Sequence, residues 1–255
     1  MPRIAVSSPS FSHIPIERMA PQIFREFPAW EIVAEHRHHL SSVRGFLREY
    51  IASNDVELRV HAPLSDINVA SFSERVRDAS NADVLETIRI SAELGVKCVT
   101  VHPGLVSPSS SLDLGLVRRL VKEAAGRLSK ASEEHGVPVA LENMPRMRWL
   151  VFQDPAELLG CIEGTGLGIC FDAGHAHTAG NTDEWLELAG RFINVHLHDN
   201  RGERDEHLVL GEGTVPFAKI LKALHGVYGG TYVIESNDLA QGVRSRDILK
   251  KMLTL

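Results

Sequence analysis

Short apolar segments rich in β-forming residues alternate with longer amphipathic stretches along the chain of 255 residues, and this alternation limits the fold more than any other feature. A helical pattern follows each apolar segment, as in Glu74 to Leu94, where apolar residues recur on one helical face. Such alternation predicts parallel strands joined by crossover helices. Eight strands are expected: Ile4 to Ser7, Trp30 to Ala34, Glu57 to His61, Lys97 to His102, Pro138 to Glu142, Leu167 to Asp172, Phe192 to His198 and Gly230 to Glu235.

Side chains that commonly bind metals fall at or just after the ends of six successive predicted strands. There are nine of them: His61, His102, Glu142, Asp172, His175, His196, Asp205, His207 and Glu235. A closed (β/α)8 TIM barrel would gather these strand ends around one mouth, whereas the competing architecture, a doubly wound open sheet, would spread them along a line. The pattern therefore favours an α/β fold with a single TIM barrel domain over residues 1–255, since no linker or low-complexity segment divides the chain.

The mixture of imidazoles and carboxylates indicates the class of metal. Five of the nine candidate ligands are histidines and four are acidic. Calcium and magnesium prefer shells made only of oxygen, while borderline-soft divalent metals accept nitrogen and oxygen together. The sequence therefore predicts Zn²⁺, with Mn²⁺ or Fe²⁺ as alternatives.

Charge and cysteine content limit the partners and the compartment. The net charge of -6 gives no overall attraction to nucleic acid or to anionic lipid, so DNA is a disfavoured partner and a membrane is not expected. The start of the chain, Met1 to Val6, leads into a strand without a signal-like apolar region. The three cysteines, Cys98, Cys161 and Cys170, lack paired metal-type spacing, and we expect them to be reduced core residues of a cytoplasmic protein.

Several short motifs, taken in order, resemble one enzyme family. They are His61-Ala62-Pro63-Leu64, Val101-His102-Pro103-Gly104, Leu141-Glu142-Asn143, Phe171-Asp172-Ala173-Gly174-His175, His196-Leu197-His198-Asp199, Asp205-Glu206-His207, Leu210-Gly211-Glu212-Gly213 and Ile234-Glu235-Ser236. This ordered set resembles the metal-site motifs of endonuclease IV (AP endonuclease family 2), within the superfamily of xylose isomerase-like TIM barrels. The resemblance spans roughly Glu57 to Glu235, most of the chain.

The resemblance implies a site for up to three Zn²⁺ ions and a hydrolase acting on phosphodiesters. It assigns His61 and His102 to a first metal, with Glu142 bridging to a second that Asp172, His196 and Glu235 complete. A third would be held by His175, Asp205 and His207. Glu142 and Glu235 become the catalytic candidates, because bridged metals can activate a water and neutralise the phosphate. His198 is expected to face the helices and to have a supporting or structural role, because only His196 aligns with the ligand position of the family.

The substrate stays open between several classes. Arg37, Arg146 and Arg148 are candidate phosphate contacts, with solvated loops as the alternative. Leu64 stands near the position where DNA-cleaving relatives carry an intruding aromatic, and the connection 35–39 is short, so we expect a small or unusual phosphodiester and keep abasic DNA open.

Two other functional classes remain. A sugar or sugar-phosphate isomerase or epimerase would use one divalent metal on Glu142, Asp172, His196 and Glu235. A catalytically silent metal-binding protein is disfavoured by the cost of burying so many charges. The oligomeric state is left open.

Overall fold

The eight strands form one closed parallel barrel in chain order in the computed structural model, which describes residues 2–254. The strands are β1 (Ile4–Ser7), β2 (Ala29–Val33), β3 (Glu57–His61), β4 (Val99–Val101), β5 (Val139–Glu142), β6 (Gly168–Asp172), β7 (Phe192–Leu197) and β8 (Tyr232–Glu235). β8 closes the barrel by pairing in parallel with β1, where Ser7 lies opposite Glu235. The predicted TIM barrel is confirmed, and the open sheet is wrong.

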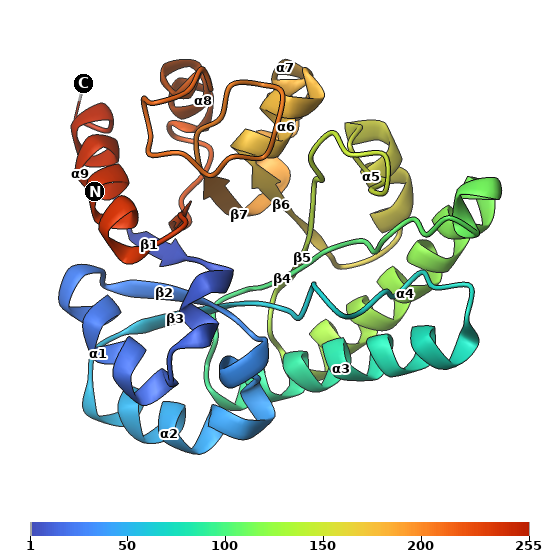
Figure 1. Cartoon of the computed structure of the whole chain (residues 1–255), viewed down its shortest axis with the longest axis horizontal. Helices are drawn as coiled ribbons and strands as arrows, with labels where there is room; N and C mark the ends of the chain where they lie inside the picture. The colour runs from blue at the N-terminus through green and yellow to red at the C-terminus, as the bar shows by residue number, and fades with distance from the viewer. Residues whose placement is uncertain (1, 255) are drawn as a thin grey trace.

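Helices surround the barrel and connect successive strands (Figure 1). The α-helices of residues 2–254 are α1 (Ile16–Glu26), α2 (Leu40–Ser53), α3 (Glu74–Glu93), α4 (Leu114–His135), α5 (Pro155–Ile162), α6 (Ala173–Ala179), α7 (Thr182–Leu186), α8 (Phe217–Leu224) and α9 (Leu239–Met252). Short 3-10 helices lie at Pro9–His13, His36–His38, Ser110–Leu112 and Ala189–Arg191. Among the helices of residues 2–254, none combines the length and apolar character that crossing a bilayer requires.

The apolar core has a large outer layer and a small inner one. Between strands and helices, bulky side chains such as Trp30 are fully buried, and the ring of Phe24 meets Trp30 edge-on at a centroid distance of 6.1 Å. Inside the barrel the apolar side chains are small, for example Ala5 and Ala29, which cluster with Val233. Small residues leave space in the barrel centre, and polar side chains occupy the layer above them.

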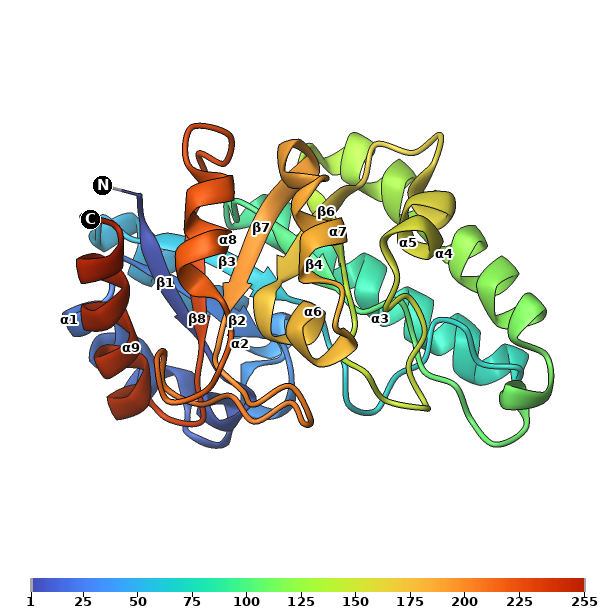
Figure 2. The ribbon, with the colours of Figure 1, turned by 90° about the horizontal axis from the view of Figure 1, so that it is seen from above.

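All strands point toward one face, where the long connections lie (Figure 2). These connections follow β3, β4, β5 and β7 and span residues 62–73, 102–113, 143–154 and 198–216. The three cysteines are all buried and free, as predicted. The fold therefore presents strand ends and long loops together at one mouth, the position at which TIM barrels carry functional groups.

Candidate metal centre

Six strand ends bring the nine predicted ligands into one continuous group of contacts at the barrel mouth. His61, Glu142 and Asp172 end β3, β5 and β6, His102 directly follows β4, and His175 lies on α6. His196 lies on β7, Asp205 and His207 lie on the loop after it, and Glu235 ends β8. Each of the nine residues takes part in at least one contact of 4 Å or less between an imidazole nitrogen and a carboxylate oxygen of the group.

Glu142 divides its two carboxylate oxygens between two sets of ligands. Oε2 lies 3.1 Å from Nε2 of His61 and 3.1 Å from Nε2 of His102. Oε1 lies 3.1 Å from Nδ1 of His196 on the opposite side. Nδ1 of His61 contacts the backbone carbonyl of Ala62 at 2.9 Å, which leaves Nε2 free to point inward. The carboxylate therefore has the orientation needed to bridge two cations.

The second ligand set is centred on His196. Its Nδ1 lies 3.1 Å from Oε1 of Glu235 and 3.9 Å from Oδ2 of Asp172. Asp172 also begins α6, because its Oδ1 accepts the backbone N–H of His175 at 2.6 Å. The helix start thus fixes one carboxylate oxygen of Asp172 and turns the other toward His196.

A third set lies beside the second. Nε2 of His175 and Nε2 of His207 are each 3.3 Å from Oδ2 of Asp205. His207 adopts a φ of 51°, a left-handed conformation that costs a non-glycine residue roughly 1–2 kcal/mol. His198 joins this set, because Nε2 lies 3.2 Å from Oδ1 of Asp205. The expectation that His198 faces the helices is wrong: residues two apart on a strand share a face, so His198 continues in the direction of His196 toward the mouth.

Carboxylates and imidazoles shift one another's pKa in this buried group. Burial opposes the charged form of His61, but the hydrogen bond and charge of Glu142 outweigh it and raise the pKa of His61 to about 9. Burial favours a neutral Glu235, yet the charge of His196 holds its pKa at about 2. The pKa of Glu142 is likewise lowered, because the His196 charge and hydrogen bonds from three imidazoles outweigh its burial. A cation binding here would displace the proton that Glu142 favours on His61.

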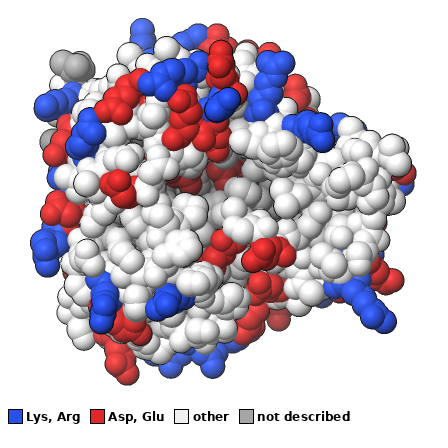
Figure 3. All heavy atoms as spheres, in the orientation of Figure 1, with Lys and Arg blue, Asp and Glu red and all other residues white. Residues whose placement is uncertain are grey.

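Several buried polar atoms of the group lack a protein partner, which indicates that the donor set suits bound cations. Within residues 2–254, Oδ2 of Asp172, Oδ1 of Asp205 and both ring nitrogens of His198 have no hydrogen bond. Leaving such atoms unpaired is costly, and metal coordination would satisfy them. Figure 3 shows acidic side chains around a hollow near the middle of the mouth face. The residues present therefore fit divalent metals with mixed nitrogen and oxygen shells.

A polar layer inside the barrel supports His196 from below. Its Nε2 lies 2.8 Å from Oε1 of Glu31, a fully buried carboxylate on β2. Oε2 of Glu31 accepts a hydrogen bond from Nδ2 of Asn194 at 2.7 Å, and Nε of Arg59 donates to Oδ1 of Asn194 at 3.0 Å. A carboxylate behind a ligand imidazole favours the tautomer whose other nitrogen faces the metal. Glu31 is a positioning residue that sequence reasoning missed, although an acid within the apolar segment Ala29–Val33 was a signal for it.

Asn143 fastens β5 to β6 beside the ligands. Its side chain accepts the backbone N–H of Asp172 at 2.7 Å and donates to the backbone carbonyl of Asp172 at 2.9 Å. Its own carbonyl contacts Nδ1 of His175 at 2.8 Å, so Nε2 of that ring faces Asp205. Asn143 was quoted as part of a motif in the sequence, but this positioning role needed the structure.

Asp199 organises the loop that carries Asp205 and His207. One carboxylate oxygen accepts the N–H groups of Asn200 and Val215 at 2.9 and 3.0 Å, and the other accepts those of Gly211 and Gly213 at 2.8 and 2.9 Å. A Cβ on Gly213 would lie 2.3 Å from Asp199 Oδ1, so only glycine allows this approach. The Leu210-to-Gly213 motif therefore shapes the loop rather than contacting the ligands.

The three arginines predicted to contact substrate lie on connections at the mouth face. Arg37 follows β2, and Arg146 and Arg148 follow β5. All three are exposed, and within residues 2–254 their side chains make no hydrogen bond or ion pair. Trp149, next to Arg148, is 51% exposed and was not singled out in the sequence. The histidines near Arg37 are instead engaged structurally: His38 is buried, with Nε2 2.9 Å from the carbonyl of Ile14.

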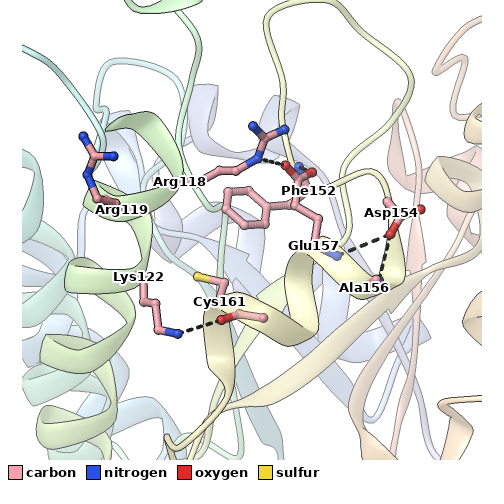
Figure 4. A pocket seen from close by; sticks show the side chains of 9 residues that line it. Arg118, Arg119, Lys122, Phe152, Asp154, Ala156, Glu157 and Cys161 are labelled. Atoms are coloured by element: carbon pink, nitrogen blue, oxygen red, sulfur yellow. Dashed lines mark hydrogen bonds and ion pairs between the residues drawn. The ribbon is translucent and has the colours of Figure 1, made fainter. Parts of the chain in front are cut away.

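A separate pocket of about 580 Å³ lies outside the barrel, between α4 and α5 (Figure 4). Arg118, Arg119 and Lys122 line it together with Phe152. Figure 4 shows Arg118 pointing to Glu157, and Lys122 donates to the carbonyl of Gly160 at 3.1 Å. Two of its three cations are thus already paired, and none of the nine metal-ligand candidates lines it, so the pocket is not part of the metal centre.

The fold and the ligand group can be compared with known proteins. The family model described as xylose isomerase-like TIM barrel matches residues 26–252. The chain is 37% identical over 238 residues to "Uncharacterized protein MJ1311" of Methanocaldococcus jannaschii, covering 90% of this chain and 81% of the relative. It is 34% identical over 195 residues to "Probable endonuclease 4" of Mycobacterium bovis, covering 70% and 72% respectively.

A solved structure is similar over nearly the whole length. The "Crystal structure of D-tagatose 3-epimerase-like protein" has a TM-score of 0.92 and 35% identity, and the match covers 99% of this chain and 97% of that one. Relatives named as an endonuclease and as an epimerase-like protein therefore share this barrel. The extent of the family match identifies the chain as a member of the xylose isomerase-like TIM barrel family.

Proposed function

We infer that the chain is a metal-dependent phosphodiester hydrolase with a multinuclear, zinc-type site and a small or unusual phosphodiester substrate. The observation that carries this inference is the orientation of Glu142, whose two oxygens face separate ligand sets at 3.1 Å. A site with one metal would give His61 and His102 no metal to bind. A site with two metals would use every residue of the two ligand sets that Glu142 faces. The relatives named "Probable endonuclease 4" add support from a hydrolase of the same family.

Different residues at the barrel mouth would have different roles in this reaction. Bound divalent metals would lower the pKa of a coordinated water, neutralise the phosphate and stabilise the leaving oxygen. Glu142 and Glu235 each bring a carboxylate oxygen to 3.1 Å from Nδ1 of His196, and their negative charge would help to hold the cations there. The exposed Arg146 and Arg148 would bind a second phosphate oxygen, and the exposed Trp149 would offer a flat surface to a ring of the substrate.

An isomerase or epimerase acting on a sugar or sugar phosphate is the second candidate. The similarity to the D-tagatose 3-epimerase-like protein, at 35% identity, favours it. This chemistry needs one divalent metal, for which Glu142, Asp172, His196 and Glu235 would suffice. The five remaining candidates, His61, His102, His175, Asp205 and His207, would then bind no metal, which is why hydrolysis is preferred.

Metal content distinguishes the two candidates, and we expect close to three zinc ions per chain. Elemental analysis of protein purified without added metal gives the stoichiometry. Anomalous diffraction at the zinc edge should give two peaks that share Glu142 and a third beside His175, Asp205 and His207. A single peak at full loading would rule out the multinuclear site and favour the epimerase.

Abasic DNA should be a poor substrate. Leu64 is half-buried, and its backbone N–H donates to Oε1 of Glu35 at 2.5 Å, so its loop is tied to the connection after β2. An aliphatic side chain on a loop held in this way cannot replace an aromatic side chain that enters the base stack. At physiological ionic strength we expect weak binding to an abasic duplex, with little preference over intact duplex.

Oligonucleotide cleavage provides the check on this expectation. Incision of the abasic strand at catalytic enzyme concentrations, with the intact control uncut, would make the chain a DNA repair enzyme. The combination of no incision and incorporation of solvent deuterium into a ketose or its phosphate would instead favour the epimerase.

A further inference from the structure

The pocket of about 580 Å³ between α4 and α5 has the size and the lining of a small-molecule site. Such sites commonly measure about 300–1,000 Å³ and combine an apolar wall with a few polar groups. Phe152, Ala156 and Cys161 line this pocket, and Figure 4 shows the Phe152 ring and the Cys161 thiol between the two helices. Burial raises the pKa of Cys161 to about 12, so the thiol stays neutral and belongs to an apolar wall.

Both acidic residues of the lining are occupied by structural contacts. Oδ1 of Asp154 accepts two backbone N–H groups in the first turn of α5, at 2.8 and 3.3 Å, and so begins that helix. Oε2 of Glu157 accepts the backbone N–H of Phe152 at 2.7 Å, and its Oε1 accepts Nε–H of Arg118. These two carboxylates therefore do not neutralise the other cations of the pocket.

Arg119 and Lys122 carry positive charge beside the apolar wall without an acidic partner. They lie three residues apart on α4, a spacing that places both side chains on one face of the helix. Within residues 2–254, Arg119 makes no hydrogen bond or ion pair, and Lys122 donates only to the neutral carbonyl of Gly160 at 3.1 Å. In the same range the two terminal nitrogens of Arg118 also have no protein partner. Charged donors next to an apolar wall suit an anionic group that is joined to an apolar body.

We propose that this pocket binds a small organic anion in which an aromatic ring carries a phosphate-like or carboxylate group. The ring would lie against Phe152 and Cys161, and the anionic group would accept hydrogen bonds from Arg119 and Lys122. None of the nine metal-ligand candidates lines the pocket, so this anion would not be the substrate of the metal centre. Its binding would not depend on the proposed hydrolysis.

Calorimetric titration with phenylphosphonate measures this binding. The probe has an aromatic ring and an anionic group, and it has no ester bond that a phosphodiesterase could cleave. We expect the double variant Arg119→Met/Lys122→Met to bind it at least about tenfold more weakly than the wild type, because both charged donors are lost. The matched control is Arg127→Met/Lys130→Met, which removes two exposed cations at the same spacing on α4. These two residues do not line the pocket, so the control should bind like the wild type.

A second probe and a crystal structure test the pocket without any variant. Methylphosphonate keeps the anionic group but lacks the ring, so it should bind to the wild type at least about tenfold more weakly than phenylphosphonate. A crystal structure with phenylphosphonate should show the anionic group beside Arg119 and Lys122 and the ring on Phe152. The proposal is wrong if the wild type does not bind millimolar phenylphosphonate, or if the folded double variant binds it equally well. Equal affinity for the two probes, or phenylphosphonate seen only at the metal centre, would also overturn it.

Discussion

Glu142→Gln is expected to abolish hydrolysis of an activated phosphodiester such as bis-nitrophenyl phosphate while the barrel stays folded. An amide is neutral and has only one good acceptor oxygen, so it cannot serve the ligand sets on both sides of Glu142. Changes in groups that only support a metal ligand typically cost about 10–100-fold in activity or affinity. Loss of a shared ligand should therefore lower kcat/KM by at least about 100-fold.

Matched carboxylate variants make this measurement specific. Glu235→Gln should also lose activity, because Glu235 contacts Nδ1 of His196 at 3.1 Å. Glu123→Gln, on the exposed face of α4, should retain the activity of the wild type. Circular dichroism and thermal melting confirm that each variant is folded. Wild-type turnover in both Glu142→Gln and Glu235→Gln would mean that the phosphodiesterase activity uses another site.

Asp199→Asn should give the largest structural effect, because one carboxylate holds both ends of a long loop. The amide would turn an NH2 group toward two backbone N–H groups that now donate to a carboxylate oxygen. Hydrogen bonds to charged groups contribute about 1.5–3 kcal/mol each, so the free energy of unfolding should fall by roughly 3 kcal/mol. For a chain of this length that corresponds to a melting temperature lower by about 6–12 °C.

The same variant should weaken the third metal site, since Asp205 and His207 lie within the loop that Asp199 holds. Metal analysis after dialysis against a chelator measures this loss. Asp183→Asn is the control: its exposed side chain pairs with Lys219, and surface pairs contribute at most about 1 kcal/mol. A melting temperature for Asp199→Asn equal to that of the wild type would show that the four amide contacts do not stabilise the loop.

The sequence was sufficient for the barrel because its signals are local. Each strand is a short apolar segment beside an amphipathic helix, and parallel topology then brings the strand ends together. Thus Glu142 and His196, which are 54 residues apart, could be assigned to one mouth before any contact was known. Their arrangement as metal ligands remains a prediction.

The supporting contacts could not be predicted in the same way. Glu31 reaches Asn194 across 163 residues, and nothing in the local pattern of β2 indicates that pairing. The direction of His198, by contrast, follows from strand alternation, because it lies two residues after His196 and so faces the same side. Strand boundaries are also the least reliable part of reasoning from a sequence.

The loop closed by Asp199 has a consequence for how such barrels diverge. Its backbone folds back on one carboxylate, so Asp205 and His207 are carried by a segment that can lengthen, shorten or be replaced without altering a strand. During evolution of the family, one insertion or deletion in this loop could then create or remove the third metal site. The ligands on β3, β5 and β8 would keep their positions. Members of the family with and without the third metal would then differ chiefly in this one loop.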